Sequence, residues 1–424
     1  MRRLLPLLAG AAALLPAAPA PAAWTPEPVP STDVLQPLDL AFDGQGRALA
    51  TWEGFAQPSR KFTGVDVRAA DGTWTRGADL AGITWGRARV HLYGSTHALL
   101  VSAQTARLGA FNRAVFRLVY AYGRSDGTFG PLRTLAEETT QQVSAANGKG
   151  QALVAWRDRR TGVTRVRERP AGGSFGATRQ LGDSGTNAAA VGEGGDRVLA
   201  WWGKDGLMAR VRRPGHGWGS ALLAVRTPAV ANAQVRALVA PGGRVVLAWE
   251  SADVREGRAT PVRAGVALRD RTGGWRRFAL ESGTTPAAFD PEASAKPVLD
   301  AQGRLAVAYT GVVDEVATAR VARVTSSGVR VRVTLGQGQV QDAAAASGGA
   351  LAVAWTARDA QRTVVWVSLR RPGAPAFDSP AALTSPDGAG FGTARVAFGP
   401  DGRALVVWTE QRDGHGVLAA ASGP

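Results

Sequence analysis

The sequence contains no cysteine. This absence excludes disulfide bonds, thiolate metal sites and a cysteine nucleophile. Lysine is scarce too, and its only occurrences are Lys61, Lys149, Lys204 and Lys296. Because the formal net charge is nevertheless +16, almost all of the positive charge is arginine. The coding bias of a GC-rich genome gives such a composition, but a field of this sign also attracts acidic surfaces such as anionic polysaccharide, membrane or nucleic acid.

Metal-binding and phosphate-binding motifs are absent as well. The histidines His91, His97, His216 and His415 are scattered and lack the spacing of zinc ligands. The sequence has no acidic loop of the EF-hand pattern and no glycine-rich phosphate loop. We therefore expect neither a metal site nor a cofactor.

Long apolar runs occur only at the N-terminus. Arg2 and Arg3 precede an apolar segment from Leu4 to Leu15, and Ala20-Pro21-Ala22 fits a small-x-small cleavage site. This order is typical of a secretory signal peptide. Residues 1–22 are thus predicted to be the signal peptide of a secreted, extracellular protein, and residues 23–424 to form its mature part without a transmembrane segment.

An internal repeat is the clearest positive feature of the sequence. Each copy is a glycine followed by an apolar run that ends in an aromatic residue, and the copies recur about every 51 residues. The copies are Gly46 to Trp52, Gly150 to Trp156, Asp196 to Trp202, Gly243 to Trp249, Gly303 to Tyr309, Gly349 to Trp355, Gly402 to Trp408 and a degenerate copy from Ser95 to Val101. We expect the repeated aromatic residues to pack between neighbouring repeats.

The segments around each copy predict four strands per repeat. Turns rich in Gly, Asn and Asp precede the apolar run, as β-hairpins require. Most repeats end with an aromatic residue followed five or six residues later by leucine, for example Trp74 and Leu80. The last repeat lacks this segment, whereas Trp24 and Val29 provide it at the N-terminus. An N-terminal strand that completes the last repeat would remove a free sheet edge.

These features resemble the β-propeller superfold, including its WD40-like repeat arrangement. The predicted fold is all-β, a single β-propeller domain over residues 23–424 with eight four-stranded blades and a ring closed by the N-terminal strand. Seven blades result if the faint repeat around Ser95 is misread. We expect the protein to be a monomer.

Counting back seven residues from each turn glycine gives the predicted ligand site. Propellers bind ligands at the mouth of the central channel, where the innermost strands begin. Six of the eight equivalent positions are charged, whereas the third and fourth repeats have Val143 and Ala188 there. The charged residues are Asp39, Arg87, Arg236, Lys296, Asp342 and Arg395. A net-positive ring of this kind favours a carboxylate or sulfate group, because arginine binds such groups bidentately.

Two turns resemble the Asp-box of the sialidases, secreted propellers that hold a carboxylate sugar with three arginines. They are Asp71-Gly72-Thr73-Trp74 and Ser125-Asp126-Gly127-Thr128-Phe129. Their spacing departs from Ser-x-Asp-x-Gly-x-x-Trp, and neither the Arg-Ile-Pro segment nor the Tyr–Glu nucleophile pair has a clear match. The resemblance implies a shared fold, and a carboxylate clamp from Arg87, Arg236 and Arg395.

The sequence favours a non-catalytic binding or interaction protein, because no catalytic set is visible. Its partner would be an anionic polysaccharide, another cell-surface polymer or a protein. The alternative is a carbohydrate-active enzyme, a sialidase-like hydrolase or a lyase, whose site lies at the channel mouth with Asp39 and Asp342 as its only acids. Nucleic-acid binding is disfavoured, since no Lys/Arg run is interleaved with aromatic residues.

Overall fold

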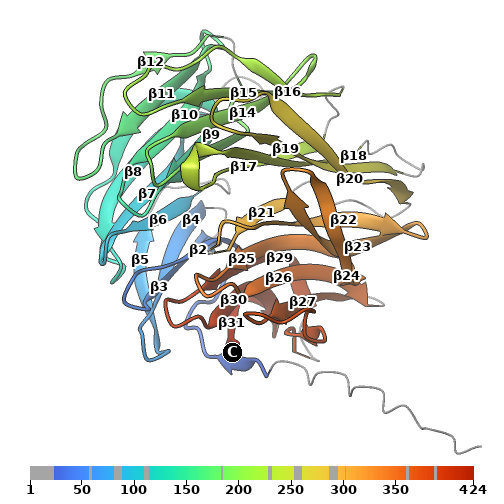
Figure 1. Ribbon diagram of the computed structural model, residues 1–424. Coiled ribbons are helices and arrows are strands. Elements are labelled where there is room, and N and C mark those ends of the chain that lie inside the picture. The colour runs from blue at the N-terminus through green and yellow to red at the C-terminus, as the bar shows by residue number, and fades with distance from the viewer. Residues whose placement is uncertain are drawn as a thin grey trace, which may run out of the picture.

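The molecule is built from antiparallel sheets arranged around a common centre (Figure 1). The computed structural model describes residues 23–56, 60–80, 88–108, 114–182, 185–227, 232–252, 260–285, 295–300, 302–359, 362–385 and 389–424. Within these ranges the regular elements are β-strands and one 3-10 turn, η2 (Pro241–Gly243), and the strands form six four-stranded sheets and one seven-stranded sheet. This all-β radial arrangement is that of a β-propeller, as the repeats predicted.

Five of the four-stranded sheets contain consecutive strands in sequence order. They are β2 (Val34–Phe42), β3 (Ala48–Ala56), β4 (Arg60–Arg68) and β5 (Trp74–Leu80); β13 (Ala188–Val191), β14 (Arg197–Gly203), β15 (Gly206–Arg212) and β16 (Leu222–Arg226); β17 (Asn232–Val239), β18 (Val245–Ala252), β19 (Thr260–Arg269) and β20 (Trp275–Thr285); β21 (Lys296–Leu299), β22 (Leu305–Val313), β23 (Val316–Thr325) and β24 (Gly328–Gln337); and β25 (Gln339–Ala345), β26 (Leu351–Asp359), β27 (Arg362–Arg370) and β28 (Ala381–Ala382). No helix in the described ranges is long and apolar enough to cross a membrane.

The seven-stranded sheet contains one strand that serves two repeats. Its strands are β6 (Arg89–Tyr93), β7 (His97–Leu108), β8 (Ala114–Arg124), β9 (Arg133–Ala146), β10 (Ala152–Asp158), β11 (Thr164–Arg169) and β12 (Arg179–Gln180). The first part of β9 pairs with β8, and the part after Glu138 pairs with β10. Glu138 itself has a φ of 51°, a left-handed conformation that bends the strand between its two partners.

The sixth four-stranded sheet joins the two ends of the chain. It contains β29 (Ala389–Phe398), β30 (Ala404–Arg412), β31 (His415–Ser422) and the N-terminal strand β1 (Thr25–Glu27), which pairs antiparallel with β31. The first strand of each repeat contacts the first strand of the next, in the order β2, β6, β9, β13, β17, β21, β25 and β29, and β29 contacts β2. The first and last sheets therefore lie side by side (Figure 1).

The repeated aromatic residues form the core between sheets, as predicted. Trp52 is fully buried and belongs to a cluster that includes Leu405 and Val407 of the neighbouring sheet. Trp156, Trp249, Trp355 and Trp408 are buried in corresponding clusters. Burying rings of this size stabilises the fold by a few kcal/mol each.

Two repeats deviate by one residue from the predicted register. In the fourth repeat the aromatic residue that packs toward the preceding sheet is Trp201 rather than Trp202, because Trp201 clusters with Leu153 and Ala155. In the second repeat Leu100 clusters with Leu49 of the first sheet. Since alternate residues face opposite sides of a strand, the position equivalent to Trp52 there is Ser102, and the prediction of Val101 was wrong.

Glycine on the third strand makes room for the tryptophan ring. Trp52 pairs across the sheet with Gly64, and a Cβ atom on Gly64 would lie 2.2 Å from Cζ2 of Trp52. We expect Gly64→Ala to lower the free energy of unfolding by about 1–3 kcal/mol, the usual cost of overpacking. Gly44→Ala is the matched control, since no heavy atom lies within 4 Å of its Cβ. Thermal unfolding of both variants tests this, and equal stabilities would contradict the packing described.

Candidate functional site

A polar cavity of about 600 Å³ lies between the first strands of the repeats. It is lined by residues of β2, β6, β7, β9, β13, β17, β25 and β29 together with the segment before β13. Because these strands come from distant parts of the chain, their side chains meet only through the arrangement of the sheets around a common centre.

Three of the six predicted ring residues, Asp39, Arg236 and Arg395, line this cavity. Lys296 and Asp342 are not among the residues that line it. Lys296 and Asp342 act electrostatically on Arg236, so they belong to the same cluster. Arg236, Lys296 and Arg395 occupy equivalent positions in their sheets. Each pairs with the residue that precedes the repeated aromatic residue on the second strand, namely Ala248, Ala308 and Val407.

Arg87, the sixth ring residue, lies outside the described residues, and Arg89 stands at the position that the count from Gly94 should have reached. Arg89 pairs with Val101 as Asp39 pairs with Thr51, and its Nη1 lies 3.7 Å from Oδ1 of Asp39. The count failed because the β6–β7 hairpin is tighter, with Tyr93 pairing with His97, whereas Phe42 pairs with Ala48 in the first repeat.

Two arginines converge on one carbonyl at the cavity wall. Nε of Arg395 donates to the carbonyl oxygen of Leu38 at 3.0 Å, and Nη1 of Arg89 donates to the same oxygen at 3.4 Å. Bringing two guanidinium groups to one neutral acceptor concentrates positive charge there. An anion that accepts hydrogen bonds from arginine fits such a place.

Both acids of the ring bridge neighbouring first strands. Oδ2 of Asp39 accepts a hydrogen bond from the backbone N–H of Val90 at 3.1 Å, and Oδ2 of Asp342 accepts one from Val396 at 3.1 Å. Each aspartate thus ties its strand to the next one around the ring. This is a structural task, and it leaves positive charge in excess, with Arg89, Arg236, Lys296 and Arg395 against two carboxylates.

Burial and mutual repulsion lower the pKa values of the cations. Burial, followed by the charges of Arg89 and Arg395, lowers the pKa of Arg236 to about 10. Burial and the charge of Arg236 also hold the pKa of Lys296 well below its ordinary value. Both shifts mean that the cavity disfavours its own positive charges, a condition that a bound anion relieves.

Three cavity residues escaped the sequence analysis. Nε2 of His91 forms a hydrogen bond with Oγ of Ser144 at 3.0 Å. Burial lowers the pKa of His91 to about 4, so its ring is neutral at pH 7. Gln142 and Thr186 are buried, and no polar side-chain atom of either has a hydrogen-bond partner among the described residues. Each unpaired polar group of this kind costs about 1–3 kcal/mol. The available signal was a polar residue beside Val143, at a position that is apolar in the fifth, seventh and eighth repeats (Val235, Val340 and Ala394), although Asn187 occupies it in the fourth.

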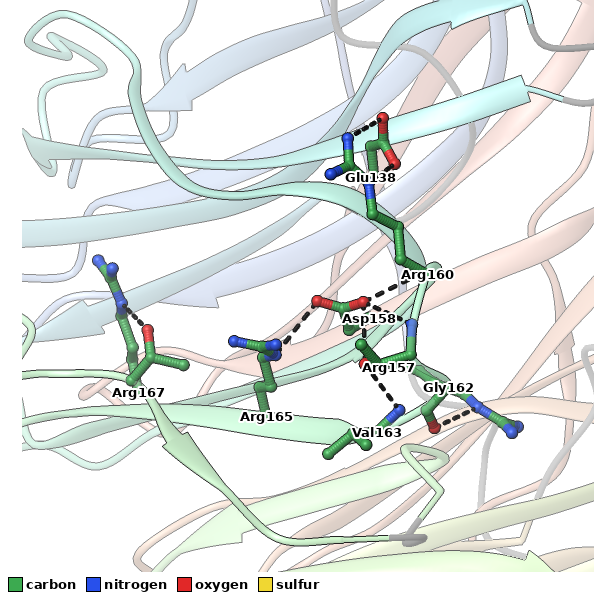
Figure 2. Close-up of polar contacts among 10 residues, drawn as sticks. Glu138, Arg157, Asp158, Arg160, Gly162, Val163, Arg165 and Arg167 are labelled. Carbon is green, nitrogen blue, oxygen red and sulfur yellow. Dashed lines mark hydrogen bonds and ion pairs between the residues drawn. The ribbon is translucent and has the colours of Figure 1, made fainter.

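An arginine-rich hairpin adjoins β9, the strand that carries Gln142. The hairpin joins β10 to β11 and carries Arg157, Arg159, Arg160, Arg165 and Arg167. Figure 2 shows Arg160 paired with Glu138 of β9 at 2.7 Å and Arg165 paired with Asp158 at 3.2 Å. Glu138 precedes Gln142 by four residues, a span of about 13 Å along a strand. The hairpin therefore places further arginines on the surface of the third repeat, and two of them are paired there with Glu138 and Asp158.

The two turns that resemble Asp-boxes serve as hairpin turns. The carboxylates of Asp71 and Asp126 accept hydrogen bonds from the backbone N–H groups of Thr73 and Thr128, at 2.9 Å and 3.0 Å. Gly72 has a φ of 94°, which the turn requires of glycine. Among the described residues, no group of three or more His, Asp or Glu side chains is arranged to hold a metal ion.

No family model matches the chain, and no curated protein matches it. Solved structures match over most of its length at low identity. An ulvan lyase bound to GlcA(1-4)Rha3S shares 10% identity with a TM-score of 0.46 and covers 92% of each chain. A Hadza microbial sialidase shares 9% identity with a TM-score of 0.40, over 87% of this chain and 74% of that one. An α-L-arabinofuranosidase from Fusarium graminearum shares 11% identity with a TM-score of 0.42, over 95% and 97%.

The chain is thus distantly similar in fold to sialidase-like propellers. At these identities the likeness concerns the fold alone, and the substrates of those enzymes do not carry over to this cavity.

Proposed function

We propose that this protein is a secreted, non-catalytic binding propeller whose central cavity takes an anionic group of a glycan or cell-surface polymer. The observation that carries the proposal is the excess of cations in the cavity, where Arg89 and Arg395 converge on one carbonyl oxygen and Arg236 lies half-buried near them. An anionic group would offset this repulsion, and guanidinium groups bind carboxylate and sulfate with directed hydrogen bonds.

The proposed domain is one propeller of eight blades over residues 23–424. The division of the seven-stranded sheet at Glu138 supports the count, because β6–β9 and β9–β12 then form two four-stranded blades. Pairing of Thr25 with Ser422 supports closure by the N-terminal strand. Glu27 of the N-terminal strand supports closure too. Its carboxylate oxygens accept hydrogen bonds from Nη2 and Nε of Arg68 in the first sheet, at 2.6 Å and 2.7 Å. A cavity completed by one chain supports a monomer.

A polymer is favoured over a small anion because the third repeat carries further arginines outside the cavity. The β10–β11 hairpin places further arginines next to β9, and Arg160 is largely exposed. A chain with repeated acidic groups could occupy the cavity and this hairpin together. Exposed charge of this sign also raises the rate at which acidic polymers associate.

The alternative function is that of a carbohydrate-active enzyme at the same cavity. It requires carboxyl groups that can exchange protons with a substrate. The two acids of the ring already accept backbone hydrogen bonds from Val90 and Val396. These bonds favour a structural role for Asp39 and Asp342, which supports binding without catalysis.

Incubation with a panel of extracellular glycans tests the proposal. Sialylated, uronic-acid, sulfated and neutral polymers are each incubated with the protein, and mass spectrometry records both the bound fraction and any products. We expect anionic members to be retained and no product to form. Product release would establish the enzyme alternative instead. Retention of no polymer would contradict the proposal and direct the search toward a protein partner.

A further inference from the structure

We infer that anion binding in the cavity is coupled to the uptake of a proton by Lys296, so that the affinity for anions falls as pH rises. This inference rests on the proposed function and adds the regulation of the same site. Lys296 does not line the cavity and need not touch the ligand, because its charge acts on the cavity from an adjoining strand.

Lys296 belongs by its position to the charged cluster around the cavity. It begins β21, which contacts β17 on one side and β25 on the other. Lys296 pairs with Ala308 as Arg236 of β17 pairs with Ala248. Asp342 takes the equivalent position on β25. The three charged side chains therefore start at corresponding points of three neighbouring first strands.

Repulsion outweighs attraction at the amine of Lys296. Asp342 favours the charged form of the amine, but its Oδ2 already accepts a hydrogen bond from the backbone N–H of Val396 at 3.1 Å. Three guanidinium groups disfavour the charged form. They are those of Arg89, Arg236 and Arg395. An extra proton on Lys296 would thus add a fourth positive charge to this part of the molecule.

Burial acts in the same direction as repulsion. Lys296 is only 8% exposed. No hydrogen bond or ion pair joins its amine to a described residue. A buried ammonium group without a partner is strongly disfavoured relative to the neutral amine. Burial, followed by the charge of Arg236, accordingly holds the pKa of Lys296 well below its ordinary value.

Among these cations, lysine is the residue type that can lose its charge near neutral pH. Guanidinium groups keep their protons in proteins, and the pKa of Arg236 is still about 10 in this cavity. The pKa of a lysine shifts readily when the side chain is buried. The repulsion among the cations is therefore relieved by loss of the proton from Lys296 rather than from an arginine.

A bound anion reverses this balance. Its negative charge offsets the repulsion that Arg89, Arg236 and Arg395 exert on Lys296. The pKa of Lys296 is then higher in the complex than in the free protein, so binding takes up a proton. Linkage is reciprocal, so the proton strengthens anion binding by the same factor. Affinity is greatest at the lower pH and decreases as pH rises through the window between the two pKa values.

Two other titratable groups near the cluster define the pH range and one control. His91 lines the cavity, but burial lowers its pKa to about 4, below the range of the experiment. Glu250 interacts electrostatically with Lys296, and burial raises its pKa to about 8, within that range. Glu250→Gln removes this second titration and should leave proton uptake in place.

Calorimetric titration of the intact chain with sulfate measures the coupling. Sulfate is the probe because it does not change its own charge between pH 6 and pH 9. Titrations in Tris, bis-tris and imidazole, whose ionisation enthalpies differ, give the number of protons taken up at each pH. We expect net uptake, and a dissociation constant that rises about tenfold in total across this range, as a shift of one pKa unit would produce.

Lys296→Met identifies the group that takes up the proton. Methionine has a similar length and no charge, so it suits a buried position beside three guanidinium groups. This variant should bind sulfate without proton uptake, and its dissociation constant should stay within about twofold across the same range. Lys204→Met is the matched control. Lys204 is exposed in the turn between β14 and β15 and does not line the cavity, so its replacement should keep the uptake.

The outcomes separate this inference from the proposed function. If sulfate binds the wild-type protein without proton uptake, or if Lys296→Met takes up as many protons as the wild type, Lys296 is not coupled to the cavity although anion binding stands. If Glu250→Gln abolishes the uptake, Glu250 is the coupled group and the inference is wrong. If neither sulfate nor a carboxylate binds at any pH, the proposed function fails and this inference fails with it.

Discussion

Replacement of Arg236 by methionine should abolish most anion binding without destabilising the protein. The variant removes one guanidinium group that would contact the ligand, and a charge-assisted hydrogen bond is worth about 1.5–3 kcal/mol. The dissociation constant for an anionic oligosaccharide should therefore rise about 10- to 100-fold. Isothermal titration calorimetry on the wild-type protein and the variant measures this change.

The stability of the same variant gives the more discriminating result. Burial and the charges of Arg89 and Arg395 lower the pKa of Arg236 to about 10, so its charge is disfavoured where it lies. Methionine retains much of the side-chain volume and removes the repulsion. We expect the free energy of unfolding to stay constant or to rise. A residue that costs stability but is needed for binding is typical of a functional site.

Arg226→Met is the control for the loss of one positive charge. Arg226 lies on β16, is exposed and does not line the cavity. If binding weakens equally in both variants, only the overall charge attracts the ligand, and the cavity is not its site. If Arg236→Met unfolds the protein, the argument from repulsion is wrong.

Glu250 should contribute a fall in stability as pH rises from 5 to 9, and Glu250→Gln should remove that contribution. Glu250 is buried on β18, and burial raises its pKa to about 8. One carboxyl oxygen accepts a hydrogen bond from the backbone N–H of Thr310 at 2.8 Å, and the other has no partner among the described residues. Glutamine keeps the accepting oxygen and cannot ionise.

The sign follows from proton binding. The unfolded glutamate ionises near pH 4.5, whereas the folded one stays protonated up to about pH 8. Between these values the folded state binds more protons at Glu250, so the contribution of this group to stability is greatest below pH 4.5 and decreases as pH rises through this window. The total decrease is on the order of a few kcal/mol. Urea unfolding at a series of pH values measures it for both proteins.

Other groups contribute to the pH dependence as well. The lowered pKa of Lys296 adds an increase of stability with pH, and this group interacts electrostatically with Glu250. Burial raises the pKa of Asp66 to about 6, which adds a decrease of the same sign. Burial lowers the pKa of His91 to about 4, which adds an increase with pH below 6.5. Glu315→Gln is the control, since Glu315 is exposed in the turn between β22 and β23. Parallel curves for the wild-type protein and Glu250→Gln would show that Glu250 ionises normally.

Much of the fold could be predicted from local sequence patterns. Glycine-containing turns and apolar runs that end in tryptophan define the strands, because hairpin turns need positive φ values and buried strands need apolar side chains. The N-terminal partner of the last sheet was predictable from Trp24 and Val29, and β1 is indeed paired with β31. These features depend on residues close together in the chain.

The candidate site was predictable only where the repeats keep a constant turn length. Asp39, Arg236 and Arg395 line the cavity as counted, because their turns share the same backbone hydrogen bond, for example from Asp43 N–H to the carbonyl oxygen of Arg47. The shorter hairpin of the second repeat moved the ring position to Arg89. A fixed count cannot register such a change.

The sequence by itself determined the repeat, the strand faces and the sign of the charge around the centre. Only the tertiary structure decided that Asp39 and Asp342 bond to neighbouring strands, that Arg89 meets Arg395, and that Gln142 is buried unpaired. The physical reason is distance along the chain. Hydrophobic periodicity acts within a strand, whereas desolvation, repulsion and hydrogen bonding between first strands depend on residues that lie tens to hundreds of positions apart.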